Sequence, residues 1–233
     1  MFDNQAAGRK FPRRGRTAGV AASVGAALIA VGFGMQPAAA GAGTIAAHRS
    51  ATAATATPAG APGLGSDNLI QSDDFFQQGL QPVSATVGTT GNQALSACSG
   101  EETMRALTKG KAGAYAEVIW TFDTDDTLLT ESVADGSTLA SATSYEQRLN
   151  ALVSSCQDEP DGHWYYGDGH AITVQGGEGT WYPSFNGDGD TAGGVAVIRS
   201  GHRFGIVELA GQPSDDPGYM EGIAAGAVNR LAD

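Results

Sequence analysis

Only the part of this 233-residue chain from Asp67 onward can build a hydrophobic core. The first 40 residues follow the three-part pattern of a secretory signal peptide. Basic residues between positions 9 and 16 precede an apolar run at 18–34, and three alanines at 38–40 precede the expected cleavage. The apolar run is shorter than the roughly 20 residues that span a bilayer. We therefore expect a secreted, extracellular protein with no stable membrane span after processing, the alternative being an uncleaved anchor.

Residues 41–66 are expected to form a disordered linker. They consist almost entirely of Ala, Gly, Thr and Pro, and they contain no aromatic residue. Such a segment cannot bury enough apolar surface to offset the entropy lost on folding. One folded domain of ordinary size, residues 67–233, remains. The pair Arg13-Arg14 leaves the general secretory route and twin-arginine export both open.

The charge balance excludes some partners. Five of the 13 basic residues but only one of the 25 acidic residues lie in the signal, so cleavage would change the formal charge from −12 to −16. A strongly acidic surface repels nucleic acid and anionic lipid headgroups. Cations, basic partners and neutral ligands are compatible with it. Simple solubility outside the cell is the alternative explanation.

Two cysteines, Cys98 and Cys156, are the only ones in the chain. In an exported protein an isolated pair predicts a disulfide. A thiol nucleophile or a metal-binding pair is the alternative, but the chain has no Cys-x-x-Cys motif and an exposed thiol would oxidise outside the cell. The long loop between the two positions predicts a large stabilisation, on the order of 4 kcal/mol.

The hydrophobic pattern predicts an α+β fold. Alternating residues predict strands, and apolar residues recurring every three or four positions predict helices. Residues 77–93 read as a loop, and short helices are expected at 72–76 and 101–107. The expected strands are 114–123, 127–133, 164–174, 180–185, 195–199 and 204–209, and the two long helices are 137–156 and a C-terminal one after Pro217. This order predicts a mainly antiparallel sheet packed by two or three amphipathic helices.

Five features in this order resemble the PknH-like extracellular sensor domain family of actinobacteria. They are Leu69-Ile70 with Ser72-Asp73, Cys98 before a short helix, Leu128 with Thr130–Val133, the long helix ending at Cys156, and Val197–Gly201 before the last strand. The resemblance covers roughly residues 69–231 and implies a stand-alone secreted member. It also implies a groove for a small ligand or envelope component, and no established enzymatic reaction. This chain lacks the second disulfide of the kinase-attached members.

Aromatic residues with polar tips are the ligand-contact candidates. They lie at Trp164, Tyr166, Trp181 and Tyr182, where a groove would combine apolar faces with hydrogen-bonding groups. Packing within the sheet is the alternative, since alternation turns about half of them inward anyway.

Two short motifs suggest chemistry of other kinds. Asp-Gly-His occurs at 161–163 and 168–170, so His163 and His170 could serve a metal-dependent or acid/base hydrolase. Turn formation by Asp-Gly explains the same residues. Residues 186–190, Asn-Gly-Asp-Gly-Asp, resemble the opening of a calcium loop but lack its closing Glu.

No cofactor is expected, because phosphate-loop, dinucleotide and nucleophile-elbow motifs are missing from the sequence. We therefore expect a non-enzymatic sensor-type domain. The alternatives are a hydrolase using His163 and His170 and an envelope interaction protein acting through its acidic surface.

Overall fold

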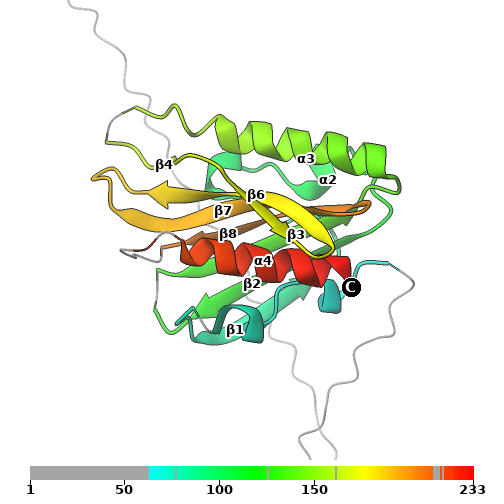
Figure 1. Ribbon diagram of the computed structural model, residues 1–233, viewed down its shortest axis with the longest axis horizontal. Helices are drawn as coiled ribbons and strands as arrows, with labels where there is room; N and C mark the ends of the chain where they lie inside the picture. The colour runs from blue at the N-terminus through cyan, green and yellow to red at the C-terminus, as the bar shows by residue number, and fades with distance from the viewer. Residues whose placement is uncertain (1–62, 77, 125, 161, 212–215, 217) are drawn as a thin grey trace, which may run out of the picture. The chain divides into compact units, whose positions relative to one another are not determined.

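The computed structural model describes residues 63–233 except 77, 125, 161, 212–215 and 217 (Figure 1). The expected signal peptide and most of the expected linker lie outside the described residues. The helices are α1 (Ser72–Phe76), α2 (Met104–Leu107), α3 (Leu139–Ser154) and α4 (Tyr219–Ala232), with 3-10 turns η1 (Ser66–Asn68) and η2 (Ala97–Ser99). The strands are β1 (Pro82–Gly88), β2 (Tyr115–Phe122), β3 (Leu128–Asp135), β4 (Tyr165–Tyr166), β5 (His170–Val174), β6 (Gly177–Phe185), β7 (Thr191–Ser200) and β8 (Arg203–Ala210).

The eight strands form one antiparallel sheet. The order across it is β1-β2-β3-β8-β7-β6-β4, and β5 pairs with a different stretch of β6. The last strand, β8, therefore inserts between β3 and β7. The two edges of the sheet are β1 on one side and the short strands β4 and β5 on the other (Figure 1).

Helices cover both faces of the sheet. On one face α4, α1 and η1 bury a core that includes Phe75, Leu129 and the apolar stripe of α4. On the other face α2, α3 and η2 bury a second core around Leu149, Phe204 and Ile206. Each central strand contributes alternate side chains to the two cores, because successive side chains of a strand point to opposite faces. The predicted α+β class with an antiparallel sheet is thus confirmed.

Local signals explain the long helix. The side chain of Thr138 caps α3 by accepting a hydrogen bond from the Ser141 amide, and the helix ends two residues before Cys156. Its apolar stripe packs on the sheet at Ala142, Leu149 and Val153. Leu139 is an exception: it lies in the first turn and stays exposed.

Two expectations about strands were wrong. Residues 82–88 were expected in a loop, but they form β1, whose exposed side chains give no amphipathic pattern to read. The expected strand at 164–174 is divided into β4 and β5. Two glycines, Gly167 and Gly169, interrupt it where the chain passes closely over Pro183 and Tyr182.

The folded part begins slightly before the expected boundary at 67. Leu64 is buried in the α4-side core, and the Gly65 amide donates to the Asn68 side chain. The described residues contain no helix that is long and apolar enough to cross a membrane.

Candidate ligand-binding site

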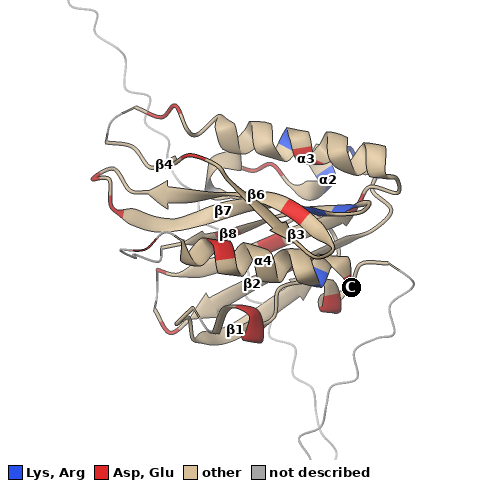
Figure 2. Ribbon diagram, viewed as in Figure 1, with Lys and Arg blue, Asp and Glu red and all other residues tan. Residues whose placement is uncertain are grey.

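Two loops at the β4 edge of the sheet enclose a pocket of about 480 Å³. One loop joins α3 to β4 and the other joins β6 to β7. The pocket is lined by Gln157, Glu159, Pro160, Gly162, His163, Tyr165, Gly187, Asp188 and Gly189. Gly162 and His163 of the first Asp-Gly-His thus meet the acidic glycine-rich run at one place, while Asp161 lies outside the described residues. Acidic residues mark these loops in Figure 2.

The two loops touch backbone to backbone. A Cβ atom on Gly187 would overlap the carbonyl oxygen of Gly162, so only glycine permits this approach. On the other side, the Gln157 side chain donates to the Gly167 carbonyl at 2.6 Å. These contacts hold the mouth of the pocket in a defined shape.

The acidic run forms a self-capped turn. The Asn186 side-chain oxygen accepts hydrogen bonds from the amides of Asp188 (3.0 Å) and Asp190 (2.9 Å). The Asn186 amide in turn donates to the Asp190 carbonyl. This arrangement turns the Asn186 oxygen toward the loop's own backbone. The loop is therefore an Asx-type hairpin turn, and its Asp188 contributes to the pocket lining.

The two candidate histidines do not share a site. His163 lines the pocket and its Nδ1 lies 3.5 Å from a Glu159 oxygen, while His170 stacks on Trp181 with ring centroids 4.4 Å apart. The described residues contain no group of three or more His, Cys, Asp or Glu arranged to hold a metal ion. The geometry therefore offers no shared catalytic pair for His163 and His170.

The disulfide joins Cys98 to Cys156, as the sequence predicted, with the two Cα atoms 6.1 Å apart. It links η2 to the residues directly after α3. The Cys156 carbonyl also accepts the Tyr166 amide at 3.2 Å. The disulfide therefore anchors the start of the loop that carries Glu159 and His163.

The four aromatic candidates lie on different faces. Trp164 is half-buried and packs edge-on against Tyr166, with centroids 4.5 Å apart. Tyr166 and Tyr182 are buried in the α3-side core, whereas Trp181 is buried on the α4 side. Trp181 and Tyr182 must diverge because they are neighbours on β6. None of the four lines the pocket, but Trp164 and Tyr166 flank Tyr165, which does.

Comparison with known proteins supplies a fold relationship. No protein-family model matches the sequence, and no curated protein sequence matches it significantly. Among solved structures, the extracellular domain of PknH from Mycobacterium tuberculosis matches 74% of this chain and 98% of that chain, with a TM-score of 0.50 and 15% identity. The fold resembles the PknH extracellular domain. The resemblance that the sequence predicted is confirmed at the level of fold, the level that so low an identity supports.

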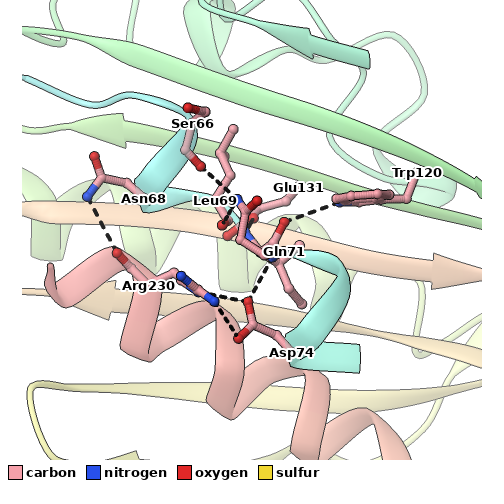
Figure 3. Close-up of polar contacts among 9 residues, drawn as sticks. Ser66, Asn68, Leu69, Gln71, Asp74, Trp120, Glu131 and Arg230 are labelled. Atoms are coloured by element: carbon pink, nitrogen blue, oxygen red, sulfur yellow. Dashed lines mark hydrogen bonds and ion pairs between the residues drawn. The ribbon is translucent and has the colours of Figure 1, made fainter. Parts of the chain in front are cut away.

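A buried carboxyl that sequence reasoning missed lies on the face of the sheet that α4 covers (Figure 3). Glu131, in the middle of β3, is fully buried beside η1 and α1. One of its oxygens accepts the Ile70 amide at 2.5 Å, and within the described residues the other has no hydrogen-bond partner. Burial, with a smaller contribution from the nearby Asp74 charge, raises the pKa of Glu131 to about 8. The sequence did contain a signal for this burial, because alternate residues of a strand share a face and Glu131 lies two positions from both Leu129 and Val133.

Polar contacts around Glu131 fasten the start of the domain to α4 (Figure 3). The Trp120 indole donates to the Ile70 carbonyl at 3.2 Å, and Arg230 of α4 forms an ion pair with Asp74 at 2.9 Å. The hydrogen bond that Arg230 donates to Asp74 is the main cause that raises the pKa of Arg230. These contacts are structural: they tie the segment after η1 to the core.

A second buried carboxyl, Glu208, contacts strand β4. The Tyr166 hydroxyl donates to Glu208 of β8 at 2.6 Å. Burial and, next, the Glu208 charge raise the pKa of Tyr166, so the phenol stays protonated and keeps donating. This bond fixes β4, and with it the pocket wall at Tyr165.

Proposed function

We propose that the folded domain is a non-enzymatic, extracytoplasmic binding domain that takes a small cationic or neutral polar ligand in the pocket between the α3–β4 and β6–β7 loops. The observation that carries the proposal is the pocket itself. Two segments far apart in sequence meet there, and a disulfide and close glycine contacts hold them. A fixed concave site of several hundred Å³ is typical of small-molecule binding.

The lining favours one class of ligand. Glu159 and Asp188 supply carboxylates, and His163 and Gln157 supply further polar groups. Tyr165 supplies an aromatic ring, which stacks on Phe185 with the ring centroids 5.2 Å apart. Carboxylates beside an aromatic ring suit an organic cation, and the ring edge with polar groups also suits a neutral polyol. Together with the acidic balance of the whole chain, this lining disfavours anions.

Export supports the same proposal. The N-terminal signal pattern and the disulfide are both typical of proteins that work outside the cytoplasm. The PknH extracellular domain, whose fold is similar, is by its name also extracellular. Trp164 is the one half-buried member of the four predicted aromatic contacts, so we keep it as a candidate for the rim of the pocket.

Ligand screening by thermal shift, followed by calorimetry on any hit, tests this proposal. Glu159→Gln and Asp188→Asn are expected to weaken binding of a cation by about ten-fold each, because each removes a charge from the lining. Asp158→Asn is the matched control, since Asp158 is exposed and lies outside the pocket lining. Trp164→Ala is expected to weaken binding less than the charge changes.

The histidines separate binding from catalysis. Replacing both His163 and His170 with Ala is expected to weaken binding less than the charge changes, because the two carboxylates of the lining remain. If the bound compound were converted to product by the wild type and not by this double variant, the hydrolase alternative would replace our proposal. Anions that bind as tightly as cations would also contradict it.

A further inference from the structure

One edge of the sheet, formed by β1, has no partner strand within the described residues. Strand β1 pairs only with β2, and no strand of the described residues lies on its outer side (Figure 1). Its five central side chains are exposed on both faces, including Val83 at 67% and Val87 at 50%. A regular, exposed edge is a template on which another strand can form hydrogen bonds.

This edge lacks the usual protection. Residues 75–100 contain no Asp, Glu, Lys, Arg or His, although the chain carries a net charge of −12 (Figure 2). Proteins usually guard an edge with charges, prolines, bulges or short strands. Here Pro82 and one bulge affect only the start of β1, and residues 84–87 pair regularly. The opposite edge is guarded, because it is divided between the short strands β4 and β5.

The sequence of β1 is self-complementary. Read in either direction, residues 83–87 give Val, a hydroxyl residue, Ala, a hydroxyl residue and Val. In an antiparallel pair centred on Ala85, Val83 lies opposite Val87 and Ser84 lies opposite Thr86. Both kinds of pair stabilise antiparallel strands. The chain already uses the hydroxyl pairing, because Ser84 bonds to Thr121 of β2 at 2.7 Å.

We propose that the partner of this edge is a second copy of the same chain. The two β1 strands pair antiparallel about a twofold axis at Ala85 and join the two sheets into one. A second copy is favoured over an unrelated strand because the residues match under that symmetry. It is also favoured because two acidic chains repel each other less where the approaching strands carry no charged residue.

Geometry makes this dimer compatible with ligand binding. The pocket lies at the β4 edge, on the far side of the sheet from β1. Pairing through β1 therefore leaves both pockets open to solvent, one at each end of the joined sheet.

Light scattering coupled to gel filtration tests the proposal. The sample is the full chain as the expression host processes it. The wild type is expected to give a concentration-dependent dimer mass. Ala85→Lys places two ammonium groups opposite each other and is expected to weaken the dimer by about ten-fold or more. Ala171→Lys is the matched control, because Ala171 is an exposed alanine on the opposite edge strand.

Cysteine cross-linking tests the register. Ala85→Cys is expected to form a disulfide-linked dimer on mild oxidation, because residue 85 faces itself across the axis. Ser84→Cys faces Thr86 instead and is expected to cross-link far less. A monomer at concentrations up to about 1 mM, a dimer that Ala85→Lys does not weaken, or equal cross-linking by both cysteine variants would each overturn the proposal.

Discussion

At the scale of single residues, burial decides what the carboxyl groups do. Glu159 and Asp188 are ordinary acidic turn residues by sequence, yet they line a pocket because two loops meet. Glu131 lies between Leu129 and Val133 on one face of β3 and is buried. Within the described residues its side chain accepts one hydrogen bond, from the Ile70 amide. Taking a carboxylate out of water is costly, so the neutral acid is favoured there.

Glu131 predicts a pH-dependent stability. Its pKa is about 8 in the folded domain against 4.5 for an exposed carboxyl. The contribution of the neutral carboxyl to stability is therefore complete below pH 4.5. The free energy of unfolding then falls as the pH rises from 4.5 through about 8, because the unfolded chain loses this proton before the folded one does. From this residue alone we expect a loss of roughly 5 kcal/mol in the free energy of unfolding.

Urea unfolding of Glu131→Gln across this pH range measures the effect. The variant stays neutral, so its stability relative to the wild type is expected to rise with pH. Glu101→Gln, an exposed change in a turn, is the control and should show no such trend. Parallel pH profiles for the wild type and Glu131→Gln would show that this carboxyl is not the cause.

At the scale of elements, the contact between the two pocket loops is the critical one. Gly187→Ala forces a Cβ atom against the Gly162 carbonyl, so one loop must move. We expect a loss of about 1–3 kcal/mol in the free energy of unfolding, as for other overpacked sites. Binding in the pocket should weaken as well, because the loops that line it shift.

Chemical denaturation and ligand titration of Gly187→Ala check this expectation. Gly65→Ala is the matched control, since a Cβ atom there has nothing within 4 Å. Its stability should stay within about 0.5 kcal/mol of the wild type. Equal stability and equal binding for both alanine variants would mean that the two loops do not constrain each other.

At the scale of the whole molecule, the disulfide acts on the unfolded chain as well as the folded one. Cys98 and Cys156 are 58 positions apart, so their bond restricts a long loop of the unfolded state. Replacing both with Ser is expected to cost about 4 kcal/mol of unfolding free energy. Unfolding curves with and without a reductant test it: the reductant should destabilise the wild type and leave the double variant unchanged.

Much of the fold follows from sequence alone. Amphipathic periodicity is a local property, so the helices α3 and α4 and the inward faces of β2 were readable from the residues. The disulfide could be predicted because the chain has only two cysteines and a signal pattern for export to an oxidising compartment. Strand β1 was not predicted, because an exposed edge strand is held by hydrogen bonds to the backbone of its neighbour. Such bonds impose no alternation of apolar and polar side chains.

The site depended on the tertiary structure. The sequence singled out His163 and the run 186–190 separately, but whether two loops meet is set by strand order, which periodicity does not encode. The same holds for Trp181 and His170, which stack because β5 pairs with β6. Sequence thus determined which segments fold and which faces they bury, because those are local energetic preferences. Only the packing of distant segments decided where a pocket opens and which edge stays free.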